Sequence, residues 1–119
     1  MRAFAFLLVL ALVPGPWLAA EESSGRQVEF GLKVAQKGLW QEARFRFERA
    51  VQLDAHNAAA RNDLAVALEQ TGDFTEARKA YEKALELKPG DIYIQQNYDL
   101  FREADDKRNR KSRKKRPQP

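Results

Sequence analysis

The chain has 119 residues and no cysteine. A single small domain is therefore expected, and disulfides, thiolate metal sites and a cysteine nucleophile are excluded. The net charge of +4 conceals an uneven distribution: residues 21–106 hold twelve Lys/Arg and seventeen Asp/Glu, whereas residues 107–116 hold eight Lys/Arg and no acid. An acidic body is followed by a basic tail.

The first twenty residues have the order of a secretory signal peptide. Arg2 supplies a positive charge, Ala3–Val13 is an unbroken apolar run, and Pro14-Gly15-Pro16 precedes small residues that end at Ala20. This order predicts cleavage after Ala20 and export of the protein, either to the periplasm or by secretion. The alternative is a membrane anchor formed by residues 3–20, a length at the lower limit for spanning a bilayer.

The middle of the chain repeats itself at an offset of 34 residues, without a gap, when Gly38 is placed over Gly72. Conservative pairs such as Trp40 with Phe74 and Phe47 with Tyr81 add to the identities. This agreement indicates an internal repeat of two units. The identical pairs are Gln36/Gln70, Gly38/Gly72, Glu42/Glu76, Ala43/Ala77, Arg44/Arg78, Glu48/Glu82, Ala50/Ala84 and Leu53/Leu87.

Each unit is predicted to be two helices joined by a glycine turn. Apolar spacing predicts helices over residues 28–37, 41–53, 59–70 and 75–87. Gly38 and Gly72 stand where a helix ends in the left-handed conformation, which glycine adopts without steric cost. Asn57 and Asp91 are suited to cap the helices that follow them.

Small residues within each unit predict close packing of its two helices. Gly31 is expected to face Ala43, and Ala65 is expected to face Ala77, so that the two helix axes approach each other. Larger side chains, among them Phe30 and Phe47, are expected to fill the remaining volume. On the second helix, Ala43, Phe47, Ala50 and Leu53 share one face. Because neither unit can bury its apolar face alone, the units should stack.

These residues resemble the tetratricopeptide-repeat (TPR) family, whose 34-residue units place small and large side chains at the same positions. The resemblance implies an all-α fold, a short right-handed α-solenoid of antiparallel helix pairs with about five helices after the signal segment. Residues 24–57 form the first unit and residues 58–91 the second. In residues 92–106 the apolar spacing of Ile94, Tyr98 and Phe101 predicts a capping helix, the first half of a third unit that is not completed.

The resemblance also implies a groove for a partner protein on the concave side, where the first helix of each unit lies. Val28 and Leu32 stand where some chaperone-binding relatives carry Lys and Asn for a peptide-carboxylate clamp. Binding of a chaperone C-terminus is therefore not expected. The alternative is that the groove residues only pack against neighbouring helices. Carried over by position, the groove residues are Val28, Leu32, Gln36, Asn62, Val66, Glu69, Tyr93 and Asn97.

The basic run after residue 106 is predicted to be a disordered tail over residues 107–119. Such a tail would bind an anionic membrane or a nucleic acid through phosphate groups. No aromatic residue is interleaved with the charges, so base stacking is not offered. The alternative is a solubilising terminus without a binding role. The basic residues are Lys107, Arg108, Arg110, Lys111, Arg113, Lys114, Lys115 and Arg116.

Catalytic chemistry is not indicated anywhere in the sequence. His56, the only histidine, is predicted to lie in an exposed loop without a nucleophile or an orienting partner. The acidic and basic residues of the helices stand at spacings typical of solvated pairs. We therefore expect no enzyme and no cofactor, but a non-enzymatic interaction module that acts as an adaptor or assembly scaffold. Because five helices are few for an independent solenoid, self-association into a homo-oligomer is a further expectation.

Overall fold

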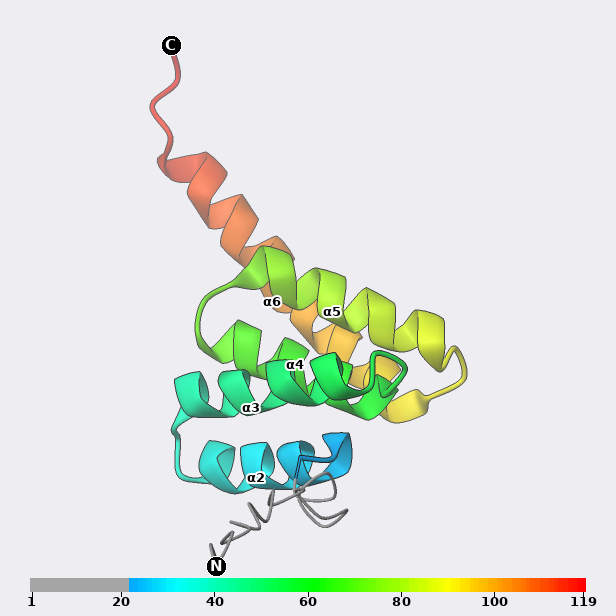
Figure 1. The fold of residues 1–119 in the computed structure, drawn as a ribbon. Coiled ribbons are helices and arrows are strands. Elements are labelled where there is room, and N and C mark those ends of the chain that lie inside the picture. The colour runs from blue at the N-terminus through cyan, green and yellow to red at the C-terminus, as the bar shows by residue number, and fades with distance from the viewer. Residues whose placement is uncertain (1–21) are drawn as a thin grey trace, which may run out of the picture.

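The computed structural model describes residues 22–119 as five α-helices (Figure 1). The predicted signal segment, residues 1–20, lies outside the described residues. No helix in the described part is long and apolar enough to cross a membrane. Every helix expected from the repeat is present within a few residues of its predicted bounds. The helices are α2 (Ser24–Gln36), α3 (Trp40–Leu53), α4 (Ala58–Gln70), α5 (Phe74–Leu87) and α6 (Ile92–Lys115).

The turns within the two units are built as the sequence predicts. Gly38 has φ +75° and Gly72 has φ +83°, the left-handed region in which a side chain is disfavoured. After Gly38, the Leu39 N–H donates to the Val34 carbonyl at 3.0 Å. This hydrogen bond closes the end of α2 in a Schellman motif, and it directs the chain back as the antiparallel helix α3.

The starts of α4 and α6 carry the predicted caps. The Asn57 side chain accepts a hydrogen bond from the Ala60 N–H at 3.0 Å, and the Asp91 side chain accepts one from the Ile94 N–H at 3.0 Å. Each side chain satisfies a backbone donor that the first turn of a helix leaves free. Both boundaries between units are therefore fixed by a local interaction.

Small residues bring the two helices of each unit together. A Cβ added to Gly31 would lie 2.5 Å from Cε1 of Phe47, so the Phe47 ring occupies the space that only a glycine leaves. In the second unit, the corresponding Ala65 and its partner Ala77 are fully buried. Close packing of the two helices is confirmed, although the atoms nearest to a Cβ at Gly31 belong to Phe47 and not to the predicted Ala43.

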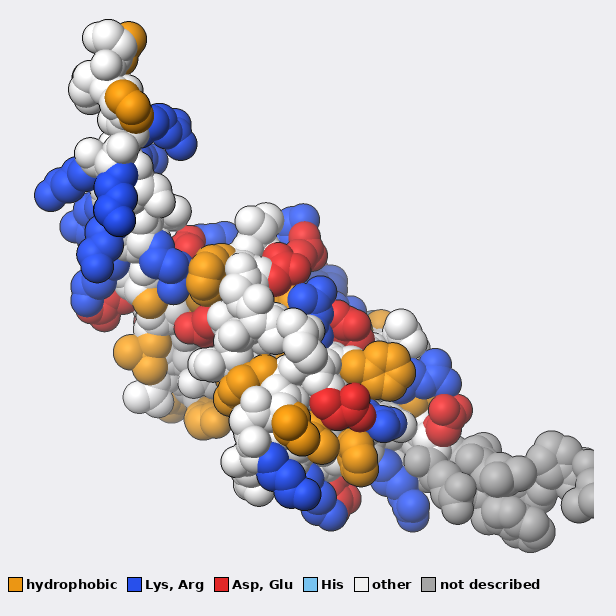
Figure 2. All heavy atoms as spheres, turned by 90° about the vertical axis from the view of Figure 1, so that its left-hand side faces the viewer, with side chains coloured by type: hydrophobic (Ala, Val, Ile, Leu, Met, Phe, Trp, Pro, Cys, Tyr) orange, Lys and Arg blue, Asp and Glu red, His pale blue; other side chains and the backbone are white. Residues whose placement is uncertain are grey.

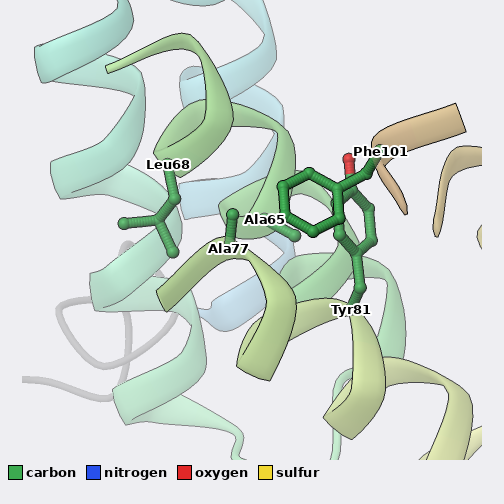
Figure 3. Close-up of a cluster of buried hydrophobic side chains, with 5 residues drawn as sticks. All are labelled: Ala65, Leu68, Ala77, Tyr81 and Phe101. Atoms are coloured by element: carbon green, nitrogen blue, oxygen red, sulfur yellow. The ribbon is translucent and has the colours of Figure 1, made fainter. Parts of the chain in front are cut away.

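The second unit and α6 share one apolar cluster, which Figure 3 shows. Phe101 of α6 is completely buried and packs against Tyr81 with 5.4 Å between ring centroids. Ala65, Leu68 and Ala77 complete the cluster. Helix α6 therefore covers the open edge of the α4–α5 pair, as expected of a capping helix.

Helix α6 differs from the first helices of the two complete units at positions that pack against the second helix there. Asp99 stands 34 residues after Ala65, at the position where the two complete units carry Gly31 and Ala65. Arg102 stands likewise at the position of Val34 and Leu68. Both Asp99 and Arg102 are exposed. At these two positions α6 is therefore polar, although Ile92 and Leu100 of the same helix are exposed.

The predicted end of α6 is corrected by the structure. The helix does not end near Asp106 but continues to Lys115, so most of the tail predicted to be disordered is helical. Lys and Arg are good helix formers, and Glu103 pairs with Lys107 one turn later at 3.0 Å. Cations in the last turn also interact favourably with the helix dipole. Pro117 follows, and Arg116 before it is already extended.

Two predicted core residues lie nearer the surface than expected. Phe30 is 45% exposed and Leu53 is 39% exposed. Phe30 belongs to the first unit, and its ring is covered by the Arg46 guanidinium at 4.3 Å from the ring centroid. The equivalent Leu64 of the second unit is partly buried, because it packs against the clusters of both units.

Candidate functional site

Three aliphatic side chains stand at equivalent positions on the first helices of the successive units. Leu32 on α2, Val66 on α4 and Leu100 on α6 are each 34 residues apart. Helix α4 contacts both α2 and α6, so the three positions follow one another across the stack. Leu32 is 45% exposed, Leu100 is 61% exposed and Val66 is half-buried. Leu100 was not among the predicted groove residues, although extending the 34-residue offset to α6 identifies it.

The structure separates the other predicted groove residues into two kinds. Gln36 and Tyr93 are exposed and can reach a ligand. Val28 is partly buried against the cluster that contains Phe47. Asn62 is only 2% exposed. Its amide packs inside the protein and does not face a ligand, contrary to the prediction.

Asn62 instead joins α4 to α6. Its Oδ1 accepts a hydrogen bond from Nδ2 of Asn97 at 3.2 Å, and its own Nδ2 lies 3.4 Å from Oδ1 of Asp63. Two predicted groove residues, Asn62 and Asn97, thus lie together, but they bind each other and hold α4 against α6. Buried amides are normally satisfied in this way.

The surface around Val66 on α4, in the middle of the aliphatic row, is acidic. The Tyr81 hydroxyl donates to Oε2 of Glu69 at 3.0 Å, and burial, together with the neighbouring Glu69 carboxylate, raises the pKa of Tyr81. Burial also raises the pKa of Asp63 to about 6, an effect that the Asn62 hydrogen bond partly opposes. Carboxylates beside an aliphatic row favour partners that carry both apolar and basic side chains.

The C-terminal part of α6 forms a basic arm, residues 107–116. Figure 2 shows Lys and Arg side chains gathered around this projecting end of the molecule. Lys107 and Arg108 pair with the carboxylates of Glu103 and Asp105, at 3.0 and 3.1 Å. No acidic residue follows Asp106 in the sequence, so the charges farther along the arm face solvent.

Arg108 is not part of a free tail, contrary to the prediction. Its guanidinium lies 3.5 Å from the centroid of the Phe74 ring, and it pairs with Asp105. One of the eight predicted tail charges therefore fastens α6 to the start of α5. The other seven are exposed.

A family model described as the tetratricopeptide repeat matches residues 29–92, more than half of the chain. The chain belongs to the tetratricopeptide-repeat family. The match spans α3, α4, α5 and most of α2, the helices that the 34-residue offset defines. A comparison with curated proteins finds no match. Tetratricopeptide repeats generally bind other proteins and are typically non-catalytic.

The described part of this TPR protein contains little that resembles a reaction centre. Among residues 22–119, no three His, Cys, Asp or Glu residues are grouped so that they could hold a metal ion. His56 lies in the exposed loop between α3 and α4, and its backbone N–H donates to the Asp54 carboxylate at 3.0 Å. The arrangement suits recognition of a partner by shape and charge.

Proposed function

We propose that this TPR protein is an exported, non-enzymatic adaptor or assembly scaffold that docks a partner polypeptide on its concave surface. The row of Leu32, Val66 and Leu100 carries the proposal. Aliphatic side chains that remain exposed at the same position of successive helices form a continuous apolar contact for a helix or an extended peptide. The acidic side chains beside the row add a preference for basic partners.

Charge reversal on the row tests this function. Leu32→Glu and Leu100→Glu change exposed side chains, so the fold should be retained. Phe45→Glu is the matched control, because Phe45 is 56% exposed on α3, outside the row formed by the first helices. A partner captured from the exported fraction should bind the control as it binds the wild type, and binding to both row variants should fall at least about tenfold.

The same measurement can reject the proposal. The captured partner is purified, and its binding is measured directly by titration calorimetry with each variant. Equal affinities for wild type, control and row variants would show that the concave surface does not bind the partner. Recovery of the protein only from the cytoplasm would show that it is not exported.

A second function, attachment to an anionic surface, is supported by the basic arm. All eight of its charges follow the last acidic residue of the chain, Asp106, and the arm is helical up to Lys115. Clustered cations of this kind bind phosphate-bearing surfaces with a strong dependence on salt. Removal of residues 107–119 should abolish salt-sensitive binding to anionic vesicles and nucleic acid; unchanged binding would reject the second function.

A further inference from the structure

The face of α6 that points away from α4 and α5 combines apolar and basic side chains. Ile92 is 83% exposed and Leu100 is 61% exposed. Lys107, Arg110 and Lys114 continue the same face toward the end of the helix, because steps of three and four residues stay on one side of an α-helix. These five residues define the outward face of α6. Tyr93, which is 67% exposed, borders it.

The apolar half of the outward face lines a shallow groove of about 630 Å³ that the α5–α6 loop closes at one end. Three acidic residues also line it, but each has a cation nearby. Asp91 lies 3.9 Å from Lys88, just after α5. Glu103 lies 3.0 Å from Lys107, and Asp99 lies 3.8 Å from Arg102. The acidic charge on this face is therefore offset locally, whereas the cations after residue 107 have no acid beyond Asp106 along the chain.

A lipid surface is the occupant that uses both halves of the outward face. Exposed aliphatic and aromatic side chains enter the boundary between headgroups and acyl chains, and Lys and Arg remain at the level of the lipid phosphates. A nucleic acid offers phosphates to the arm, but its backbone gives Ile92 and Leu100 no apolar partner. The arm also has no aromatic side chain on which a base could stack.

We propose that α6 lies along the surface of an anionic phospholipid membrane through its outward face. Ile92, Tyr93 and Leu100 enter the interface, and Lys107, Arg110 and Lys114 contact lipid phosphates. The inference rests on the second function, attachment through the basic arm, and adds the apolar half of α6 and the kind of surface. Over residues 92–114 the helix measures about 35 Å, so the two halves of the face act on one membrane patch.

Two variants of the full chain separate the apolar and the basic contributions. One replaces Ile92 and Leu100 with Ser, and the other replaces Lys107, Arg110 and Lys114 with Gln. The matched control replaces Lys79, Lys83 and Lys88 with Gln, which removes three exposed or half-buried charges from the α5 region. Since all of them keep residues 1–20, the predicted signal or anchor contributes equally, and thermal unfolding followed by circular dichroism verifies the fold.

Co-sedimentation with vesicles gives the decisive result. The probes are vesicles of phosphatidylcholine with phosphatidylglycerol, vesicles of phosphatidylcholine alone, and a short DNA duplex. On anionic vesicles, the partition coefficient of the Gln variant of the arm should be at least about tenfold below that of wild type. The partition coefficient of the control should fall by no more than about threefold. The Ser variant should lose about fivefold or more on anionic vesicles and should bind DNA as wild type does.

Failure of the second function and failure of the inference about α6 give different binding results. If the arm variant binds anionic vesicles as the control does, both the second function and the membrane-lying helix are rejected. If the arm variant loses vesicle and DNA binding equally while the Ser variant is unchanged, the arm is a general polyanion binder and only the inference about α6 is rejected. Equal binding of wild type to neutral and anionic vesicles also rejects it. Leu100 belongs both to the docking row and to the outward face, so docking on the concave surface is judged separately, from Leu32→Glu.

Discussion

The guanidinium of Arg108 lies 3.5 Å from the centroid of the Phe74 ring, and this contact joins the middle of α6 to the first residue of α5. Asp105 completes the junction: its carboxylate accepts from Arg78 at 2.8 Å and from Arg108 at 3.1 Å. The Arg78 hydrogen bond is the main reason that the pKa of Asp105 is lowered. The basic arm thus starts from a fixed anchor.

Removal of the Asp105 carboxylate should loosen that anchor. In Asp105→Ala, Arg78 and Arg108 lose their shared acceptor, and the free energy of unfolding should fall by about 1–2 kcal/mol. Amide hydrogen exchange in residues 107–115 should accelerate more than exchange in α4. Urea unfolding and exchange followed by mass spectrometry measure the two effects.

Asp106→Ala is the matched control for the anchor, because the neighbouring Asp106 is exposed. It removes the same charge from α6 without removing the shared acceptor. Equal acceleration of exchange in the two variants would show that Asp105 supports the arm only through its charge on the helix.

The two helical glycines of α2 should respond in opposite directions to alanine. In Gly31→Ala the new Cβ would meet Phe47, which is 2% exposed and cannot move aside freely. Overpacking should outweigh the gain in helix propensity and lower the free energy of unfolding by about 1–2 kcal/mol. A Cβ added to Gly25 would have no atom within 4 Å. Gly25→Ala should therefore raise the free energy of unfolding by up to about 1 kcal/mol. Urea unfolding of both variants checks the pair, and a stabilised Gly31→Ala would contradict the close packing of α2 on α3.

Most of the helical stack could be predicted from the sequence because it rests on local signals. The 34-residue offset located the glycine turns, and Asn57 and Asp91 marked the starts of α4 and α6. Leu100 could have been found in the same way, had the offset been extended beyond the second unit. These features depend on residues within one or two turns of each other.

Features that depend on a neighbouring helix could not be predicted. Asn62 is buried because Asn97 of α6 reaches it, whereas the Phe30 ring stays 45% exposed and is covered only by the Arg46 guanidinium. The arm was predicted to be disordered from its composition. The acidic residues before it and the Arg108–Phe74 contact instead let α6 continue. Residues 1–20 remain a predicted signal or anchor.

The Tyr81 hydroxyl should contribute more to stability than that of its neighbour Tyr98. Tyr81 is 1% exposed and donates to Glu69 at 3.0 Å, so Tyr81→Phe should lower the free energy of unfolding by about 1 kcal/mol. Tyr98→Phe is the matched control, since that hydroxyl donates to Glu82 at 2.9 Å in an exposed position and should cost only a few tenths of a kcal/mol. Urea unfolding compares the two, and equal losses would mean that burial does not strengthen the Tyr81 hydrogen bond.

The buried carboxyl of Asp63 should make stability fall as the pH rises through weakly acidic values. Its pKa is raised from 3.8 to about 6 in the folded protein, chiefly by burial. Between these two values the folded state holds a proton that the unfolded state has lost, so a higher pH favours unfolding. Below about pH 4 both states are protonated and the cost is absent, and above about pH 6 it is fully present.

Asp63→Asn removes this titration while it keeps the size and shape of the side chain. Relative to wild type, the variant should gain free energy of unfolding progressively from pH 4 to pH 7, by up to about 3 kcal/mol. Asp99→Asn, at an exposed position, should follow the wild-type curve as the matched control. Urea unfolding at each pH measures the difference. A constant difference between Asp63→Asn and wild type across this range would show that Asp63 titrates alike in the folded and unfolded states.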